Sequence, residues 1–294
     1  MSADTTPATA TRIPAPDRGR RLGLFRGEHG PSPLLQSRLG RISLPILSLV
    51  VFFTAWQIAG AHVNPILLSS PSSVAKAFWD LLTNGQLAPA FISAMKDLAI
   101  GYGLAAVVGI GAGLAMGRSP VLERIFDPYV NFFQATPLIA LVPLIVIWFG
   151  VNLEARVAIT FILGVWSVII NTTTGVKQTP PSLLDVGRIY KFNRRQTILR
   201  IQLPNAVPSI FAGLRIGLGK ALFGVMIAQL EISVSGLGGL VVNYGNAFKT
   251  AYLLAAVATA SLVGVVAASV LELIRKRLFP WTEAQDAAGW KSAG

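Results

Sequence analysis

The sequence contains no cysteine and only two histidines. Without cysteine the chain can form no disulfide, and it offers neither a thiol nucleophile nor a thiolate metal site. His29 and His62 fall in a polar N-terminal stretch and in an expected loop, outside the apolar runs. This excludes a histidine-rich metal site or a serine–histidine pair within a membrane.

Charged residues are also scarce. They make up 13% of the 294 residues, whereas hydrophobic residues make up 53%, and the mean hydropathy is +0.60. A soluble domain of this length does not normally show such a balance, so the composition predicts a polytopic membrane protein. The net charge of +12 comes from basic residues between apolar runs, where they set orientation in the membrane. Nucleic acid is therefore not expected as a partner.

The apolar runs predict an all-α bundle of about six transmembrane helices. The predicted spans are residues 42–60, 98–116, 126–149, 157–176, 209–230 and 252–274. Six spans place both ends on one side, and the opposite side then keeps only Lys76, Lys96, Arg156 and Lys249 as basic residues. Because cytoplasmic loops carry the excess of lysine and arginine, both termini are predicted to lie in the cytoplasm.

The chain is expected to form one membrane domain with two polar tails. Residues 1–40 lack apolar periodicity and predict a disordered, basic cytoplasmic tail. Residues 41–280 form the transmembrane domain, and residues 281–294 form a second cytoplasmic tail.

Small residues recur at every fourth position in several spans. In the second span this ridge consists of Gly101, Ala105, Gly109, Gly113 and Gly117. The fifth and sixth spans carry similar ridges that include Gly217 and Ala260. Such ridges let another helix approach closely, so close helix packing is the favoured interpretation and a cavity wall is the alternative.

The third span is interrupted by Pro137 and Pro143 and carries three uncharged polar residues, Asn131, Gln134 and Thr136. Polar groups beside a proline break are tolerated in a membrane where neighbouring helices or water satisfy the freed backbone. These residues therefore form a candidate translocation path. A kinked packing helix with satisfied amides is the alternative.

Lys220 lies about eleven residues into the fifth span, about 16 Å from its start by helix rise and so near mid-bilayer. A lysine at that depth needs a partner. It either faces a water-filled path, where it attracts an anion, or pairs with an acid on another chain. Lys220 is therefore added to the candidate path.

Residues 179–208 form a polar, basic segment between apolar runs. Ser182, followed by Asp185, is typical of a helix N-cap with a capping-box acid, and Asn193 marks a turn before a second apolar stripe that ends at Pro204. The pattern predicts a helix–turn–helix hairpin on the cytoplasmic membrane surface. An ordinary positively charged inner loop is the alternative.

Several stretches of this sequence resemble the permease subunits of binding-protein-dependent ABC importers, most closely the nitrate, sulfonate and taurine group. They are LSSPSSVAKAFWDLL, FFQATPLIALVPLIVIWFG, LPNAVPSIFAGLRIGLGKA and SGLGGLV, and together they cover most of the chain after the tail. The resemblance implies a type I ABC importer fold in the cell membrane, without enzymatic activity of its own. It also implies transport of a small organic or inorganic nutrient. Sulfonates and nitrate are the anionic examples in this group, which Lys220 favours, and uncharged or aromatic nutrients are the alternative.

The resemblance further implies the partners. Two permease copies, identical or different, would form the pore, and a periplasmic or lipoprotein solute-binding protein would deliver the substrate. The hairpin would dock an ABC ATPase subunit. No cofactor is expected in this chain, because ATP and Mg would be bound by that ATPase.

The residues implied for ATPase coupling are Asp185, Val186, Gly187, Arg188, Lys191, Arg195, Ile201, Leu203 and Pro204. The usual acidic, alanine, alanine start of this loop is Asp185, Val186 and Gly187 here, and Lys191 occupies the position that is normally glycine at the turn. Gln229 stands where these permeases often have glutamate, and it completes the candidate path.

Two other classes of protein are alternatives to a permease. An ion-coupled secondary transporter should show intramembrane carboxylates and an internal repeat. We expect no buried aspartate in the spans, and Glu231 sits at a span boundary. An intramembrane enzyme would need a nucleophile with a base, or a metal cluster, inside the spans, and the lack of cysteine and of membrane histidine disfavours it.

Overall fold

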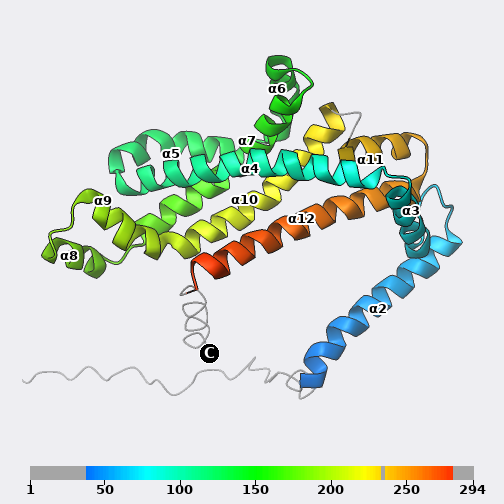
Figure 1. The fold of residues 1–294 in the computed structure, drawn as a ribbon, viewed down its shortest axis with the longest axis horizontal. Helices are drawn as coiled ribbons and strands as arrows, with labels where there is room; N and C mark the ends of the chain where they lie inside the picture. The colour runs from blue at the N-terminus through cyan, green and yellow to red at the C-terminus, as the bar shows by residue number, and fades with distance from the viewer. Residues whose placement is uncertain (1–37, 233–235, 281–294) are drawn as a thin grey trace, which may run out of the picture. The chain divides into compact units, whose positions relative to one another are not determined.

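The computed structural model describes residues 38–232 and 236–280, and every regular element within these ranges is helical. In chain order the elements are α2 (Arg38–His62), α3 (Pro71–Thr83), α4 (Leu87–Arg118), α5 (Pro120–Ala135), η1 (Leu138–Leu141), α6 (Val142–Phe149), α7 (Leu153–Lys177), α8 (Pro181–Ile189), α9 (Arg194–Thr197), η2 (Ile198–Gln202), α10 (Leu203–Ile232), α11 (Gly236–Asn246) and α12 (Thr250–Leu278) (Figure 1). The predicted tail 281–294, and the predicted N-terminal tail up to residue 37, lie outside the described residues. The all-α class is confirmed.

The chain divides into two compact units, Met1–Phe52 and Phe53–Gly294, and the boundary falls within α2. In the first unit the side chains of residues 43–52 are exposed, although most of them are apolar. Such a helix matches the predicted first span, because Ser43–His62 is long and apolar enough to cross a membrane. His62, expected in a loop, is the last residue of this helix.

Five helices in the described ranges are long and apolar enough to cross a membrane, and a bent pair gives a sixth. The pair consists of Pro120–Ala135 and Leu138–Phe149, which meet at 92°. The break falls at Thr136 and Pro137, since proline has no N–H to continue the helical hydrogen bonds. The predicted interruption of the third span is therefore confirmed.

The glycine ridge of α4 packs directly on α7. A Cβ atom added to Gly101, Gly109, Gly113 or Gly117 would lie only 2.5 to 2.7 Å from an α7 side chain. The α7 partners are Thr160, Val168, Thr172 and Val176, in the same order. Both helices repeat their contacts every four residues, so the ridge lets the two backbones lie close together along most of their length. The close-packing prediction is confirmed for this span.

The ridges of α10 and α12 are also packing surfaces. A Cβ on Gly213 would lie 2.6 Å from Cβ of Asn171, and a Cβ on Gly217 would lie 2.9 Å from the carbonyl oxygen of Gly164. On α12, a Cβ on Gly264 would lie 2.5 Å from Cδ2 of Leu222. Helix α7 therefore packs against both α4 and α10.

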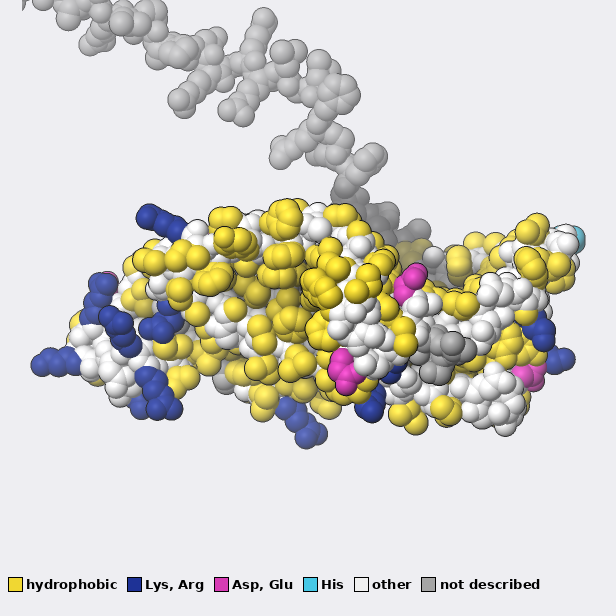
Figure 2. All heavy atoms as spheres, turned by 90° about the horizontal axis from the view of Figure 1, so that it is seen from above, with side chains coloured by type: hydrophobic (Ala, Val, Ile, Leu, Met, Phe, Trp, Pro, Cys, Tyr) yellow, Lys and Arg dark blue, Asp and Glu magenta, His cyan; other side chains and the backbone are white. Residues whose placement is uncertain are grey.

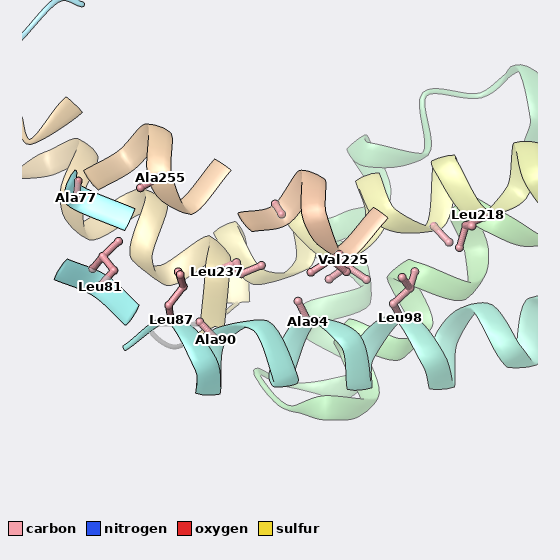
Figure 3. Close-up of a cluster of buried hydrophobic side chains, with 13 residues drawn as sticks. Ala77, Leu81, Leu87, Ala90, Ala94, Leu98, Leu218, Val225, Leu237 and Ala255 are labelled. Atoms are coloured by element: carbon pink, nitrogen blue, oxygen red, sulfur yellow. The ribbon is translucent and has the colours of Figure 1, made fainter. Parts of the chain in front are cut away.

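A cluster of buried apolar side chains joins the other helices to this centre. Leu98 of α4 is 2% exposed, and Val225 of α10 and Leu237 of α11 are fully buried. Figure 3 shows these residues facing one another, with Leu81 of α3 and Ala255 of α12 at the far end of the cluster. Ser70 caps α3 and accepts a hydrogen bond from the backbone N–H of Ser73. Ala77 and Leu81 of α3 are buried in the cluster and hold this helix on the core.

Two expectations about local structure were wrong. Ser182 does not cap α8, because the helix already begins at Pro181 with Pro180 as its cap residue. The second helix of the hairpin is not a separate piece, since helical structure runs without interruption over Arg194–Ile232.

Candidate functional site

Helices α8 and α9 form a hairpin that is closed by local hydrogen bonds. The amide of Phe192 donates to the carbonyl of Gly187 at 2.8 Å, and the amide of Lys191 donates to that of Arg188 at 3.0 Å. This pair of bonds is a Schellman motif, whose residue after the C-cap takes a left-handed conformation. Lys191 occupies that position with φ of 51°. Glycine adopts this conformation without strain, which explains why the position is normally glycine in the resembling loops.

The second half of the hairpin starts with a capping box. The side chain of Asn193 accepts from the backbone N–H of Gln196 at 2.8 Å, and the side chain of Gln196 accepts from the N–H of Asn193 at 2.9 Å. Gly187 is buried where α8 meets this half, and a Cβ there would lie 2.8 Å from Cδ1 of Ile201. Gly187 thus allows the two arms to approach.

The tip of the hairpin exposes apolar and basic side chains together. Ile189 is 77% exposed and Tyr190 is 71% exposed. Arg188 pairs with Asp185 at 2.9 Å, and Arg195 is exposed on α9. Lysine and arginine side chains gather at the end of the molecule where α8 and α9 lie, whereas the visible face between the ends is mostly hydrophobic (Figure 2). Exposed apolar residues ringed by charge are typical of a protein-binding surface.

The predicted coupling residues divide into two groups. Asp185, Val186, Arg188, Lys191 and Arg195 are exposed on the hairpin. Gly187 is buried, and Ile201, Leu203 and Pro204 are half-buried where the hairpin joins α10. The first group is available to a partner, and the second group holds the joint together.

The joint between hairpin and fifth span is a π-helical turn. The amide of Leu203 donates to the carbonyl of Ile198, five residues back, and Pro204 follows. Pro204 lacks an N–H, and the wider turn before it accommodates the missing hydrogen bond. The helix therefore continues through the proline instead of ending there, and the hairpin and α10 share one helical run, Arg194–Ile232.

A cavity of about 360 Å³ brings together three of the predicted path residues. Gln134 and Thr136 come from the end of α5, and Lys220 comes from the middle of α10. Apolar residues of η1, α7 and α10 complete the lining. The 92° break between α5 and η1 is what places Gln134 and Thr136 opposite α10.

Lys220 forms no ion pair with a carboxylate of the described residues, and it is only half-buried. The hydroxyl of Thr136 donates to the carbonyl of Phe132 at 2.7 Å, so it meets the cavity only as an acceptor. Lys220 and the Gln134 amide are therefore the side-chain hydrogen-bond donors among the residues that line the cavity.

The other two predicted path residues lie elsewhere. Asn131 is exposed one turn before the cavity and donates to the carbonyl of Asp127 at 2.9 Å. Gln229 is fully buried and does not line the cavity. Its Nε2 donates to Oδ2 of Asp97 at 2.9 Å, and its Oε1 accepts from the amide of Gly238 at 3.2 Å.

Gln229 belongs to a buried polar cluster that we call the clasp, consisting of Asp97, Arg156, Gln229 and Gly238. Nε of Arg156 donates to Oδ2 of Asp97 at 3.0 Å, and the Asp97 side chain is 1% exposed. The clasp connects α4, α7, α10 and α11, at the end of these helices away from the hairpin. Oδ1 of Asp97 is buried without a partner among the described residues.

The expectation that no aspartate is buried in the spans was wrong. Asp97 lies in Leu87–Arg118, which starts well before the predicted second span. The spacing along α4 could have predicted the burial of Asp97. Asp97 precedes Gly101 by four residues, so it lies on the same helix face as the small-residue ridge that packs on α7. Arg156, assigned to the outer side, is its partner. No group of metal-ligating side chains occurs among the described residues.

Comparison with known proteins places these features in context. Residues 105–283, more than half of the chain, match the family model described as "Binding-protein-dependent transport system inner membrane component". The chain is 30% identical over 251 residues to the bicarbonate transport system permease protein CmpB of Synechocystis sp., which covers 81% of this chain and 89% of that protein.

Two further relatives have similar coverage. The nitrate import permease protein NrtB of Leptolyngbya laminosa is 27% identical, over 87% of this chain and 95% of its own. The taurine transport system permease protein TauC of Escherichia coli is 27% identical, over 82% and 90%. In fold, the chain is similar to an inward-facing structure of the MetNI methionine ABC transporter, with a TM-score of 0.54, 15% identity, and coverage of 64% of this chain and 96% of that chain.

Proposed function

The chain belongs to the family of binding-protein-dependent transport system inner membrane components, and on this premise we propose that it forms the translocation path for a small anionic nutrient and couples that path to a separate ATPase. Its relatives are permease subunits of ABC importers. The observation that carries the proposal is the continuous helical run Arg194–Ile232, which begins in the exposed basic hairpin and contains Lys220.

The path runs past the cavity at Lys220. A lysine in the middle of an apolar helix is costly unless it faces water or a partner. The relatives are named for bicarbonate, nitrate and taurine, each of which carries an anionic group. Lys220 is placed to attract such a group, and Gln134 offers it a second donor.

A second permease copy covers the face on which Lys220 lies. Phe223 is 60% exposed, Ile216 is 51% exposed and Ile139 is 48% exposed on the surrounding surface. If lipid covered this face, the Lys220 ammonium would lie in hydrocarbon without a partner. A second copy with a water-filled path between the two proteins would let water solvate the ammonium. Because the same argument applies to an identical or a related copy, it supports a dimeric pore of either kind.

The hairpin receives the ATPase. This chain offers its exposed Ile189 and Tyr190, ringed by arginine and lysine, to a cleft in that subunit. Closure of such a cleft around ATP and Mg would displace the hairpin and, through the π-helical joint, α10. The hairpin and both termini then lie in the cytoplasm, and a solute-binding protein delivers substrate at the opposite end.

An ion-coupled secondary transporter is less well supported. It needs a carboxylate inside the spans that can change its charge or its partner. Asp97 is such a carboxylate by position, but it already accepts hydrogen bonds from Arg156 and Gln229. It therefore acts as a structural residue.

The test is reconstitution of the full-length chain in proteoliposomes with its co-purifying ATPase and its solute-binding protein, with labelled taurine and nitrate as probes. We expect uptake only with ATP and all three proteins. Exchange of Arg188 and Arg195 for glutamate should lower uptake at least about tenfold while the chain still inserts, because the hairpin then repels its partner. Arg124→Glu, an exposed site on α5, is the matched control. Uptake driven by an ion gradient without the ATPase would overturn the proposal.

A further inference from the structure

Another cavity, an apolar groove of about 550 Å³, lies between α4, α5 and α7, and we call it the α5 groove. Every side chain that lines it is apolar or aromatic. They include Met116 of α4, Leu122, Phe126, Tyr129 and Phe133 of α5, and Trp166 of α7. A surface of this kind offers water few hydrogen-bond partners, so the expected occupant is an apolar molecule.

The groove leaves α5 poorly covered by protein. All 16 residues of this helix are described, and only Val130 among them is buried. Ile125 is 51% exposed, Phe126 is 48% exposed and Tyr129 is 61% exposed, although all three line the groove. A contiguous exposed apolar surface marks a contact with a membrane or with another protein.

The groove and the proposed translocation path lie on opposite faces of α5. The exposed polar residues of this helix follow one another at intervals of three or four, so they form one stripe. They are Arg124, Asp127, Asn131 and Gln134. Gln134 lines the cavity at Lys220, whereas Leu122 and Phe126 are each two residues from Arg124 and so about 200° away around the helix. The groove therefore faces away from the side that is proposed for the second permease copy.

The groove has the length and depth of one lipid leaflet. From Leu122 to Phe133 it extends along α5 for about 16 Å by helix rise, which is half of a hydrocarbon core of ~30 Å. It begins at the basic end of the spans, where α4 ends at Arg118 and α7 ends at Lys177. Basic residues at the ends of spans lie at the level of the lipid headgroups. One acyl chain of a lipid with its headgroup at this level therefore matches the groove.

The charge at this end of the groove favours an anionic headgroup. Arg118 is exposed and makes no ion pair with a carboxylate of the described residues. It follows Ala115 by three residues, so it lies on the flank of α4 that borders the groove. Glu123 is compensated by Lys177, whose Nζ lies 2.5 Å from Oε1. The Arg118 guanidinium is therefore available to a phosphate, which it can bind through two hydrogen bonds.

We propose that the α5 groove binds one acyl chain of an anionic phospholipid, whose phosphate lies at the Arg118 guanidinium. The bound chain completes the packing of α5 on α4 and α7, and it thereby supports the helix end that carries Gln134. This site is separate from the proposed translocation path and does not depend on which solute is transported.

Quenching of tryptophan fluorescence by brominated lipid tests the proposal. Trp166 lies in the groove and stacks on Phe133, with ring centroids 4.7 Å apart. The full-length permease, with the other five tryptophans replaced by phenylalanine, is placed with its ATPase in phosphatidylcholine nanodiscs that contain a minor fraction of phosphatidylglycerol. An equal amount of one lipid or the other carries bromine in its acyl chain. Brominated phosphatidylglycerol should quench Trp166 at least about threefold more, because Arg118 concentrates the anionic lipid at the groove.

Two pairs of variants separate the contributions of head and chain. Arg118→Gln should abolish the preference for phosphatidylglycerol, whereas its matched control Arg124→Gln, on the opposite face of α5, should keep it. Ala115→Phe should lower the quenching by both lipids at least about twofold, because the ring occupies the space of the chain. Its matched control is Val108→Phe, at a 46% exposed residue of α4 outside the groove, and it should leave the quenching unchanged.

Native mass spectrometry of the complex with all tryptophans in place provides an independent measurement. After a wash with detergent, the permease should retain phosphatidylglycerol in preference to phosphatidylcholine, and Arg118→Gln should lose it while Arg124→Gln retains it. This readout does not depend on the tryptophan replacements.

Four outcomes would overturn the proposal. Equal quenching by the two lipids would indicate ordinary boundary lipid, and no quenching by either would indicate that protein, such as a second copy, closes the groove. Equal effects of Arg118→Gln and Arg124→Gln would indicate a general effect of surface charge. The fourth outcome is that the washed complex retains no phosphatidylglycerol.

Discussion

Two of the polar side chains of helix α10, Lys220 and Gln229, lie in opposite environments. Gln229 is fully buried in the clasp, where both ends of its amide have partners. Lys220, nine residues earlier, is half-buried at a cavity and has no carboxylate partner among the described residues. In an apolar bundle the number of partners therefore separates a structural polar group from one that is free to bind a ligand.

Each charged residue of the clasp has a partner of opposite charge, whereas Lys220 has none among the described residues. Asp97 and Arg156 compensate each other at 3.0 Å, so neither needs water or a ligand. Removing one member leaves the other as an uncompensated charge, whereas removing Lys220 leaves nothing unpaired. Three substitutions test this contrast through the free energy of unfolding.

The largest effect is expected for Asp97→Leu. Arg156 would remain with an 18% exposed side chain and no carboxylate, and Gln229 would lose its acceptor. We expect a loss of about 3–5 kcal/mol, measured by chemical unfolding in detergent. Asp127→Leu, at an exposed acid on α5, is the control and should change stability by less than about 0.5 kcal/mol.

The double variant Asp97→Leu, Arg156→Leu sharpens this test. It removes both charges, so it should recover part of the loss caused by Asp97→Leu alone. A double variant that is less stable than either single variant would contradict the view that the two charges compensate each other.

A smaller effect is expected for Gln229→Glu. A carboxylate at this position would lie beside the Asp97 carboxylate, where Gln229 now donates a hydrogen bond at 2.9 Å. Repulsion between two buried like charges with one arginine should cost about 1–3 kcal/mol, measured in the same unfolding assay.

Exchange of both partners provides the control for that variant. Asp97→Asn combined with Gln229→Glu moves the carboxylate to the other side of the same hydrogen bond and leaves one negative charge for Arg156. It should be more stable than Gln229→Glu alone. If the double variant is no more stable than Gln229→Glu alone, the loss of stability comes from placing a carboxylate at position 229 and not from the balance of charges in the clasp.

The smallest effect on stability is expected for Lys220→Met. No ion pair is broken, and an apolar side chain replaces a charge within an apolar span, so stability should change by less than about 1 kcal/mol or should rise. Anion uptake by the reconstituted complex should nevertheless fall at least about tenfold. A loss of stability as large as that of Asp97→Leu would show that Lys220 is a structural residue, and the contrast with the clasp would then be wrong.

Much of the framework could be predicted from the sequence. Hydropathy located the spans, and the four-residue spacing of Gly109, Gly113 and Gly117 correctly indicated a helix interface. The hairpin before the fifth span was predicted as well, although its second helix continues into that span. These features depend on neighbours within about four residues along the chain, which is the range over which helical periodicity acts.

The division of the polar residues into a clasp and a cavity was decided by the tertiary structure. Gln229 pairs with a residue 132 positions away, and Lys220 shares a cavity with Gln134 only because the chain bends by 92° after α5. Gln229 and Lys220 both look like isolated polar residues in an apolar helix, so their sequence surroundings do not distinguish them. Their roles depend on which distant donors and acceptors packing brings within hydrogen-bond distance, and helical periodicity carries no information at that separation.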